Sequence, residues 1–138
     1  MANDGGIGRL NRRLAAIPGF AKEAAQKSVV RQAETMAKAM RAKAPRKTGK
    51  LRDSIVVTPP DATTPAYSQP GGAVIVPETT AVITAGNSEV RYAHLVEYGT
   101  NKTNAQPYFW PSVREGNKKA QRNIKTAITR AIKKEWGK

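Results

Sequence analysis

The chain has 138 residues, of which 24 are Lys or Arg and 10 are Asp or Glu, so its formal net charge is +14. This length suits a single domain with its own core, and no apolar run approaches the length that a membrane-spanning helix needs. The sequence contains no cysteine, which excludes disulfides and thiolate metal sites and is compatible with assembly in a reducing cytoplasm.

The first third of the chain predicts one long helix. A polar arm over residues 1–8 has no apolar signal core, so export by a signal peptide is not expected. A short amphipathic piece with Leu10, Leu14 and Ile17 follows. From Phe20 to Ala44 small apolar residues recur every three or four positions, which is typical of a helix, and Pro45 ends it by disfavouring helical geometry at the preceding residue.

The middle of the chain predicts strands and a long loop. Residues 46–49 are expected to form a turn, and Leu51–Thr58 is expected to be the first strand because it is rich in β-branched residues. Residues 59–72 combine prolines, glycines and hydroxyl side chains, which indicates a mobile loop. The β-branched runs Ala73–Pro77 and Thr80–Ala85 then predict a hairpin.

The last third predicts two helices. Tyr92–Tyr98 has the apolar spacing of a short helix, with Gly99 as its C-terminal stop. Ser112–Trp136 is expected to be a second long helix with Ser112 as its N-cap. Helices at the ends and strands between them predict one α+β domain over residues 1–138, with two long helices packed on a small, mostly antiparallel sheet.

Sequence motifs for catalysis are missing. There is no phosphate-binding glycine loop and no nucleophile elbow, and a catalytic triad would have to use His94, the sole histidine. His94 and Glu97 share the spacing of metal ligands but have no recognisable third partner. We therefore expect neither an enzyme nor a cofactor or metal site.

Positive charge is concentrated at the two ends of the sequence. Residues 1–60 hold 13 basic and 4 acidic residues, residues 61–90 hold 3 acidic and no basic residues, and residues 91–138 hold 11 basic and 3 acidic residues. Such a field attracts nucleic acid or an acidic protein surface, but solvated basic helix faces explain it equally well. A small basic nucleic-acid-binding module is the alternative function, although the aromatic residues that would stack on bases are separate from the basic helices.

Aromatic residues gather in residues 92–111, which read YAHLVEYGTNKTNAQPYFWP. This stretch holds three of the four tyrosines, and Pro107 and Pro111 bracket the triplet Tyr108-Phe109-Trp110. Buried aromatics dominate both cores and interfaces. The pattern therefore leaves two interpretations open, a packing site inside the chain or a docking surface for a neighbour.

Three motifs in order carry a family resemblance. The chain reads APRKTGKLRDSI over residues 44–55, YAHLVEYGT over residues 92–100, and QPYFWPS over residues 106–112, just before a basic C-terminal helix. Together they resemble the gene-product-ten-like, HK97-type tail-component family of long-tailed bacteriophages. The triplet Tyr108-Phe109-Trp110 is more aromatic than that family's usual Pro-Phe.

The resemblance implies a structural virion protein of the neck or head-proximal tail end. Such a subunit forms a homo-oligomeric ring, expected to be hexameric, acts in tail completion and head–tail joining, and is assembled in the cytoplasm of the host bacterium. Its partners would be the neighbouring connector and tail proteins. Most of the basic charge would meet acidic protein rings, with non-specific contact to DNA in the channel as a further use.

Two sets of residues are singled out within these motifs. A ring needs interfaces in which one surface of each subunit meets a different surface of the next, and aromatic side chains suit such anchors. We therefore assign interface roles to Tyr92, Tyr98, Tyr108, Phe109 and Trp110, with packing of Phe109 and Trp110 into the core as the alternative. The residues assigned to structural turns are Pro45, Thr48, Gly49, Gly99, Pro107 and Pro111.

Overall fold

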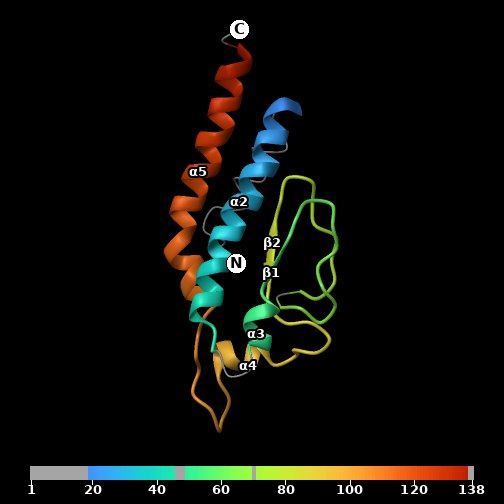
Figure 1. Cartoon of the computed structure of the whole chain (residues 1–138), viewed down its shortest axis with the longest axis vertical. Helices are drawn as coiled ribbons and strands as arrows, with labels where there is room; N and C mark the ends of the chain where they lie inside the picture. Colours follow the sequence, from blue (N-terminus) through green and yellow to red (C-terminus); the bar gives the residue numbers. More distant parts are fainter. Residues whose placement is uncertain (1–18, 46–48, 70, 137–138) are drawn as a thin grey trace, which may run out of the picture.

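The computed structural model shows an elongated α+β domain, which confirms the predicted fold class. The structure describes residues 19–45, 49–69 and 71–136. The expected arm at 1–8, the amphipathic piece before Pro18 and the turn residue Thr48 lie outside the described residues. Figure 1 shows helices α2 (Gly19–Lys43) and α5 (Trp110–Trp136) running side by side in opposite directions, with a two-stranded sheet on the other side of α2.

Helix α2 spans Gly19–Lys43 and confirms the predicted long N-terminal helix. Its buried face consists mostly of alanines, among them Ala33 and Ala37, and this small surface lets α5 approach closely. At one crossing point a methyl group added to Gly116 of α5 would lie 3.4 Å from the Cε atom of Met36. The helix ends just before Pro45, as expected from the geometry that proline imposes.

The prediction of a strand starting at Leu51 is wrong. Residues Lys50–Asp53 form a short helix, α3, and strand β1 covers only Val56–Thr58. Gly49 adopts a left-handed conformation with φ of 78°, which glycine tolerates without strain. The Ser54 hydroxyl then donates to the Leu51 carbonyl at 2.6 Å. These local bonds close a helical turn. The strand that the β-branched residues favour therefore begins only after this turn, with β1.

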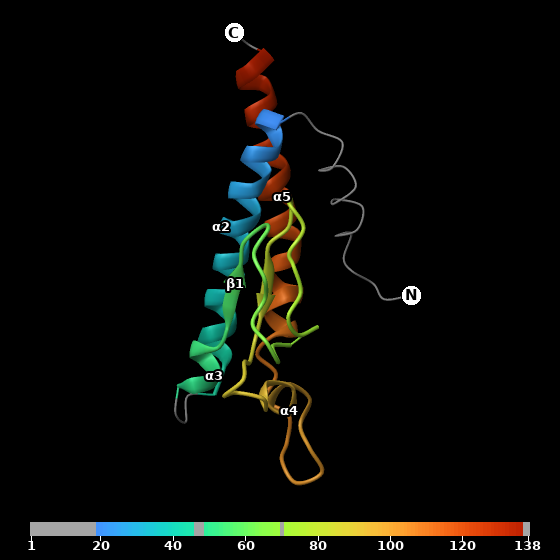
Figure 2. The same cartoon turned by 90° about the vertical axis from the view of Figure 1, so that its right-hand side faces the viewer.

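The predicted hairpin between residues 73–77 and 80–85 is also wrong. Strand β2, Val82–Thr84, pairs antiparallel with β1, so that Val57 faces Ile83. Residues 73–77 form no named strand. They pair instead with an earlier part of the chain, through an isolated bridge between Thr63 and Ile75. The chain between the two strands is therefore one long hairpin, folded over so that Gln69 returns to bridge Ala85 at the end of β2 (Figure 2).

The segment of residues 59–72, predicted to be a loop, contains no named helix or strand among its described residues. Side-chain bonds hold its turns. The Thr64 hydroxyl accepts the backbone N–H of Val74 at 2.8 Å, and the Ser68 hydroxyl donates to the carbonyl of Pro65 at 2.6 Å. Its mobility stays a prediction.

Helix α4 spans Ala93–Tyr98, and helix α5 spans Trp110–Trp136. Both confirm predicted helices, but Ser112 is not an N-cap. Helix α5 begins two residues earlier, and the Ser112 hydroxyl donates back to the Tyr108 carbonyl at 2.9 Å. Pro111 lies in the first turn, where the missing N–H of proline is tolerated.

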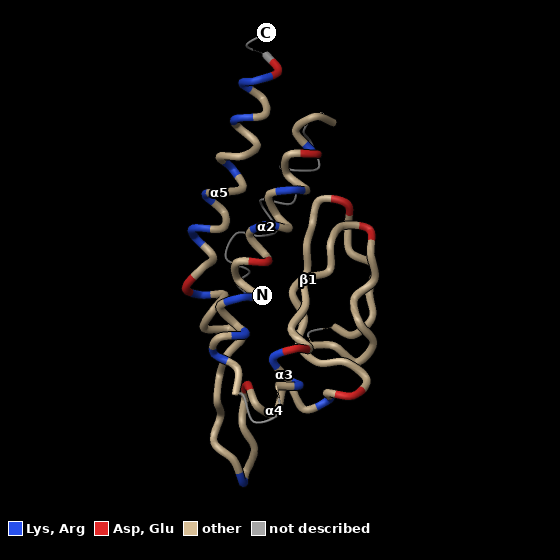
Figure 3. Tube along the Cα trace, in the orientation of Figure 1, with Lys and Arg blue, Asp and Glu red and all other residues tan. Residues whose placement is uncertain are grey.

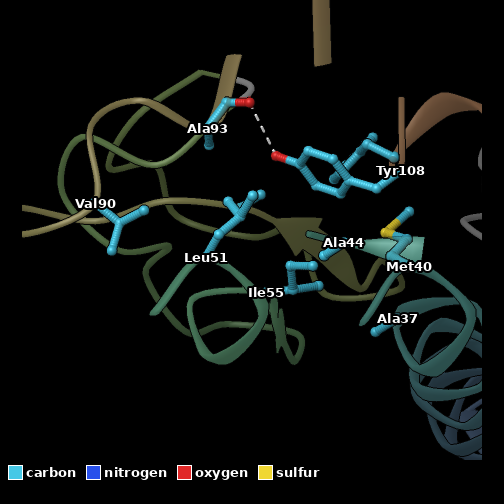
Figure 4. Close-up of a cluster of buried hydrophobic side chains, with 10 residues drawn as sticks. Ala37, Met40, Ala44, Leu51, Ile55, Val90, Ala93 and Tyr108 are labelled. Atoms are coloured by element: carbon cyan, nitrogen blue, oxygen red, sulfur yellow. Dashed lines mark hydrogen bonds between the residues drawn. The ribbon is translucent and has the colours of Figure 1, made fainter. Parts of the chain in front are cut away.

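The main core lies where α2, α3, α4 and the segment just before α5 meet. It buries residues from each of these parts, among them Met40, Leu51, Ala93, Tyr108 and Phe109. Figure 4 shows the Tyr108 ring within this cluster and its hydroxyl bonded to the carbonyl of Ala93. All three motif segments therefore contribute to a single packing site.

Candidate assembly interface

A buried carboxylate joins two of the motif segments. Glu97, on α4, is only 6% exposed. Its Oε1 atom accepts the backbone N–H groups of Tyr108 at 3.0 Å and Phe109 at 2.7 Å. These residues directly precede α5, so Glu97 supplies acceptors at the start of a helix from a different element. A negatively charged group is also favoured there by the helix dipole. We call this arrangement the Glu97 clamp.

The clamp sets the direction of the aromatic triplet. Tyr108 and Phe109 are 1% and 8% exposed and lie in the chain's own core. The Tyr108 hydroxyl donates to the Ala93 carbonyl at 3.1 Å. Burial raises the pKa of Tyr108 well above its usual range, and the neighbouring Glu97 and Tyr98 raise it further. Both rings are therefore inaccessible to a neighbouring subunit in this structure.

The third ring of the triplet faces outward. Trp110 is 38% exposed, and its indole N–H donates to the hydroxyl of Tyr98 at 2.7 Å. Tyr98 is itself 67% exposed. Trp110 also stacks edge-on against Phe109, with ring centroids 5.1 Å apart. A core residue therefore supports the exposed pair from beneath.

Exposed apolar side chains continue along α4. Tyr92, Leu95 and Tyr98 are spaced by three residues, which places them on one helix face, and all three are exposed. We call these three residues together with Trp110 the α4 surface. Beside it, a groove of about 390 Å³ is lined by Tyr92, Leu95 and Val96 on one side and by residues from the loop after α4 on the other.

The loop after α4 is anchored at both ends. Gly99 has φ of 78°, and its N–H donates to the Leu95 carbonyl at 2.8 Å, confirming the predicted helix stop. At the far end the Gln106 N–H returns to the Val96 carbonyl at 2.9 Å. The loop between them, which includes Lys102, projects beyond the body of the molecule (Figure 3). Pro107 lies next to Gln106 and is exposed.

The first motif, APRKTGKLRDSI, is a structural junction in its described residues. The guanidinium of Arg41 donates twice to the Ile55 carbonyl, at 3.0 and 2.8 Å, and ties α2 to the start of β1. The Ser54 hydroxyl accepts the N–H of Gly86 at 2.9 Å. A side chain on Gly86 would lie 2.7 Å from the Val90 carbonyl, so glycine is required at this contact.

Sequence analysis missed the roles of Arg41, Ser54 and Glu97. The signal for Glu97 was present, because it is an acidic residue on the core side of a short helix. The sequence pattern indicated a different role for Glu97, as half of a metal-ligand pair that has no third partner. His94, the other half, is exposed, and the described residues contain no group of three His, Asp or Glu side chains that could hold a metal ion.

A second group of exposed apolar residues lies on the folded hairpin. Val74 and Ile75 are 45% and 76% exposed. We call these two residues the hairpin surface. Tyr67, at the returning tip of the hairpin, is 55% exposed and carries the Arg91 guanidinium 3.9 Å from its ring centroid. Exposed apolar side chains that lie together are suited to contact with a partner.

Comparison with protein families decides the identity. The family model described as "Bacteriophage HK97-gp10, putative tail-component" matches residues 8–99, which is two thirds of the chain. The chain belongs to this family. The match includes the first motif, all but the last residue of the second motif and the Glu97 clamp's carboxylate, and it ends before the aromatic triplet. Searches of curated proteins and of solved structures find no match.

Membership of the HK97-gp10 family makes the chain a bacteriophage tail component and gives it a place in the virion. A tail component acts together with other structural proteins of the particle. No helix in the described part of the chain is both long and apolar enough to cross a membrane.

Proposed function

We propose that the protein is a structural, non-enzymatic subunit that forms a homo-oligomeric ring of six copies at the neck or head-proximal end of the tail. There it completes the tail and joins it to the head, in contact with the neighbouring connector and tail proteins. The observation that carries this proposal is the α4 surface. Four large apolar side chains stay exposed there, although the core directly beneath them is well packed.

Support beneath the α4 surface makes it suitable as an interface. Trp110 rests on Phe109, and the Glu97 clamp holds the backbone of Phe109. Interfaces gain most of their affinity from a few rigid aromatic anchors, because fixed side chains lose little entropy on binding. A nucleic-acid-binding module accounts for the charge of the chain but not for this surface.

Closed rings need two different surfaces on each subunit. The hairpin surface is the second exposed apolar group, and it lies on the side of the molecule away from α5 (Figure 1). In the proposed ring the α4 surface of one subunit contacts the hairpin surface of the next. Each subunit then uses both surfaces once, and the copies close into a ring when the rotation between neighbours returns to the first copy.

Two substitutions test this arrangement. Tyr98→Asp damages only the α4 surface, and Ile75→Asp damages only the hairpin surface. Both side chains are more than half exposed, so each variant is expected to fold, as circular dichroism will show. The wild-type protein is expected to assemble in native mass spectrometry, and each variant alone is expected to be monomeric.

An equal mixture of the two variants gives the deciding result. The intact hairpin surface of the Tyr98→Asp variant fits the intact α4 surface of the Ile75→Asp variant, so the mixture is expected to form heterodimers but no rings. A monomeric wild type would reject self-assembly. Assembly by either variant alone, or a mixture that stays monomeric, would reject the pairing of these two surfaces. Thr126→Asp, at an exposed position of α5 sixteen residues beyond Trp110, is the control that should leave assembly unchanged.

A further inference from the structure

The outer face of α5 is a continuous basic surface. Residues 116–134 contain seven Lys or Arg and no acidic residue, and Arg114 adds an eighth cation one turn earlier. All eight side chains are exposed, and they lie opposite the helix face that packs on α2; they are Arg114, Lys118, Lys119, Arg122, Lys125, Arg130, Lys133 and Lys134. Figure 3 shows Lys and Arg positions recurring along the whole length of α5. We call these eight residues the α5 stripe.

Four of the six basic residues of α2 are bound by other groups of the chain. Lys22 pairs with Glu78, Lys27 with Glu23 and Lys43 with Glu115, and the Arg41 guanidinium binds the Ile55 carbonyl. Within the described part of the chain, none of the α5 stripe residues takes part in an ion pair. The stripe is therefore charge that the fold leaves open to a partner.

A second copy of this chain cannot neutralise the stripe. Of the ten acidic residues, four are already paired with cations, and Glu97 is buried in its clamp. Among the described residues only Glu34, Asp61 and Glu89 remain exposed and without an ion pair or other electrostatic partner. They lie on three separate segments. Three scattered carboxylates do not match eight cations on one helix face.

The composition of the stripe also distinguishes nucleic acid from an acidic protein. Protein interfaces are depleted in lysine and are built around apolar anchors, whereas five of the eight stripe cations are lysines and no aromatic residue lies between them. Binding to single strands relies on base stacking against aromatic rings, which this face also lacks. The exposed hydroxyls of Thr126 and Thr129 add donors of the kind that bind phosphate oxygens.

We infer that the α5 stripe binds the phosphate backbone of double-stranded DNA without sequence preference. From Arg114 to Lys134 the stripe extends along about 30 Å of straight helix, at 1.5 Å per residue. Its cations can therefore contact several successive phosphates. The inference concerns the isolated chain and does not depend on the proposed ring, so the two can fail separately.

The test measures binding of the full chain to a fluorescent DNA duplex by anisotropy over a range of salt concentrations. The variant Lys118→Gln/Lys125→Gln removes two cations from one line of the stripe. Removing one phosphate contact reduces the slope of log K against log salt by about 0.9, so removing two reduces it by about 1.8. At about 0.15 M salt this corresponds to a roughly 30-fold weaker affinity. A duplex of scrambled sequence is expected to bind equally well.

The matched control is Arg31→Gln/Lys38→Gln, which removes the same charge from exposed positions of α2 that form no ion pair among the described residues. It is expected to change the affinity less than about 3-fold, because only the general field weakens. Equal effects of both variants would overturn the inference, since net charge alone would then explain binding. Tighter binding to polyglutamate of matched charge than to the duplex would overturn it in favour of an acidic protein partner.

Discussion

Removing the Glu97 clamp gives the most direct test of how this fold is held together. Glu97→Ala leaves the backbone N–H groups of Tyr108 and Phe109 buried without their acceptor. Each unpaired buried donor costs about 1–3 kcal/mol. The free energy of unfolding should therefore fall by about 2–6 kcal/mol, a large part of the stability of a typical domain.

The variant Glu97→Gln separates the acceptor from the charge. The amide oxygen of glutamine can occupy the place of Oε1, which accepts both N–H groups. Its NH₂ group then replaces Oε2, which lies 3.4 Å from the Phe109 nitrogen. One acceptor atom is retained and one weak contact becomes unfavourable. We expect the free energy of unfolding to fall by about 1–2 kcal/mol, less than in the alanine variant.

Urea unfolding followed by tryptophan fluorescence measures both values, and an unchanged slope against urea concentration shows that only stability has changed. His94→Ala, at an exposed position of the same helix, is the control and should stay within about 0.5 kcal/mol of the wild type. A decrease of less than about 1 kcal/mol for Glu97→Ala would refute the clamp. Equal decreases for the glutamine and alanine variants would show that charge, and not the acceptor, stabilises this site.

Two further predictions follow from the same region. Gly99→Ala places a Cβ atom 2.7 Å from the Ala105 nitrogen, at a residue whose φ is 78°. It should therefore lower the free energy of unfolding in urea by about 1–3 kcal/mol. The control Gly19→Ala, whose Cβ meets nothing within 4 Å, should leave it unchanged, and equal effects of the two variants would contradict the geometry. Because the pKa of Tyr108 is raised in the folded state, its contribution is fully present below the ordinary tyrosine pKa of about 10 and declines as the pH rises above it. Comparing urea unfolding of wild type and Tyr108→Phe at about pH 8 and pH 11 should show a smaller alkaline decrease in stability for the variant; an equal decrease would contradict this assignment.

Helices could be predicted well from this sequence, because their signals are local. The apolar spacing that predicts α2, α4 and α5 lies within each segment, and so do the stop signals Pro45 and Gly99. The errors at Leu51 and Ser112 each concern a few residues at an element's end. At both places a serine hydroxyl bonds to a preceding carbonyl and changes where the element begins.

Strand pairing could not be predicted, because partners are distant in sequence. Residues 73–77 have strand-like composition, but they pair with residues near Thr63, and β2 pairs with β1 across 23 intervening residues. Ile75 is also highly exposed, contrary to the usual burial of β-branched residues. Nothing in the composition of either run distinguishes one partner from another.

The candidate interface was predicted in part. The sequence located the aromatic stretch but left open whether its rings face inward or outward, and the structure divides them. Tyr108 and Phe109 lie in the core, while Tyr92, Tyr98 and Trp110 are exposed. The backbone of Tyr108 and Phe109 is held by Glu97, eleven and twelve residues away, which no local pattern reveals.

The Glu97 clamp also bears on how this family should be divided for experiments and comparison. The family match ends at residue 99, between the carboxylate and the two N–H groups that it binds. A fragment cut there would leave Glu97 without its hydrogen-bond partners and would remove Tyr108 and Phe109 from the core. The region matched by the family model is therefore smaller than the packed unit in this structure, and helix α5 belongs to that unit.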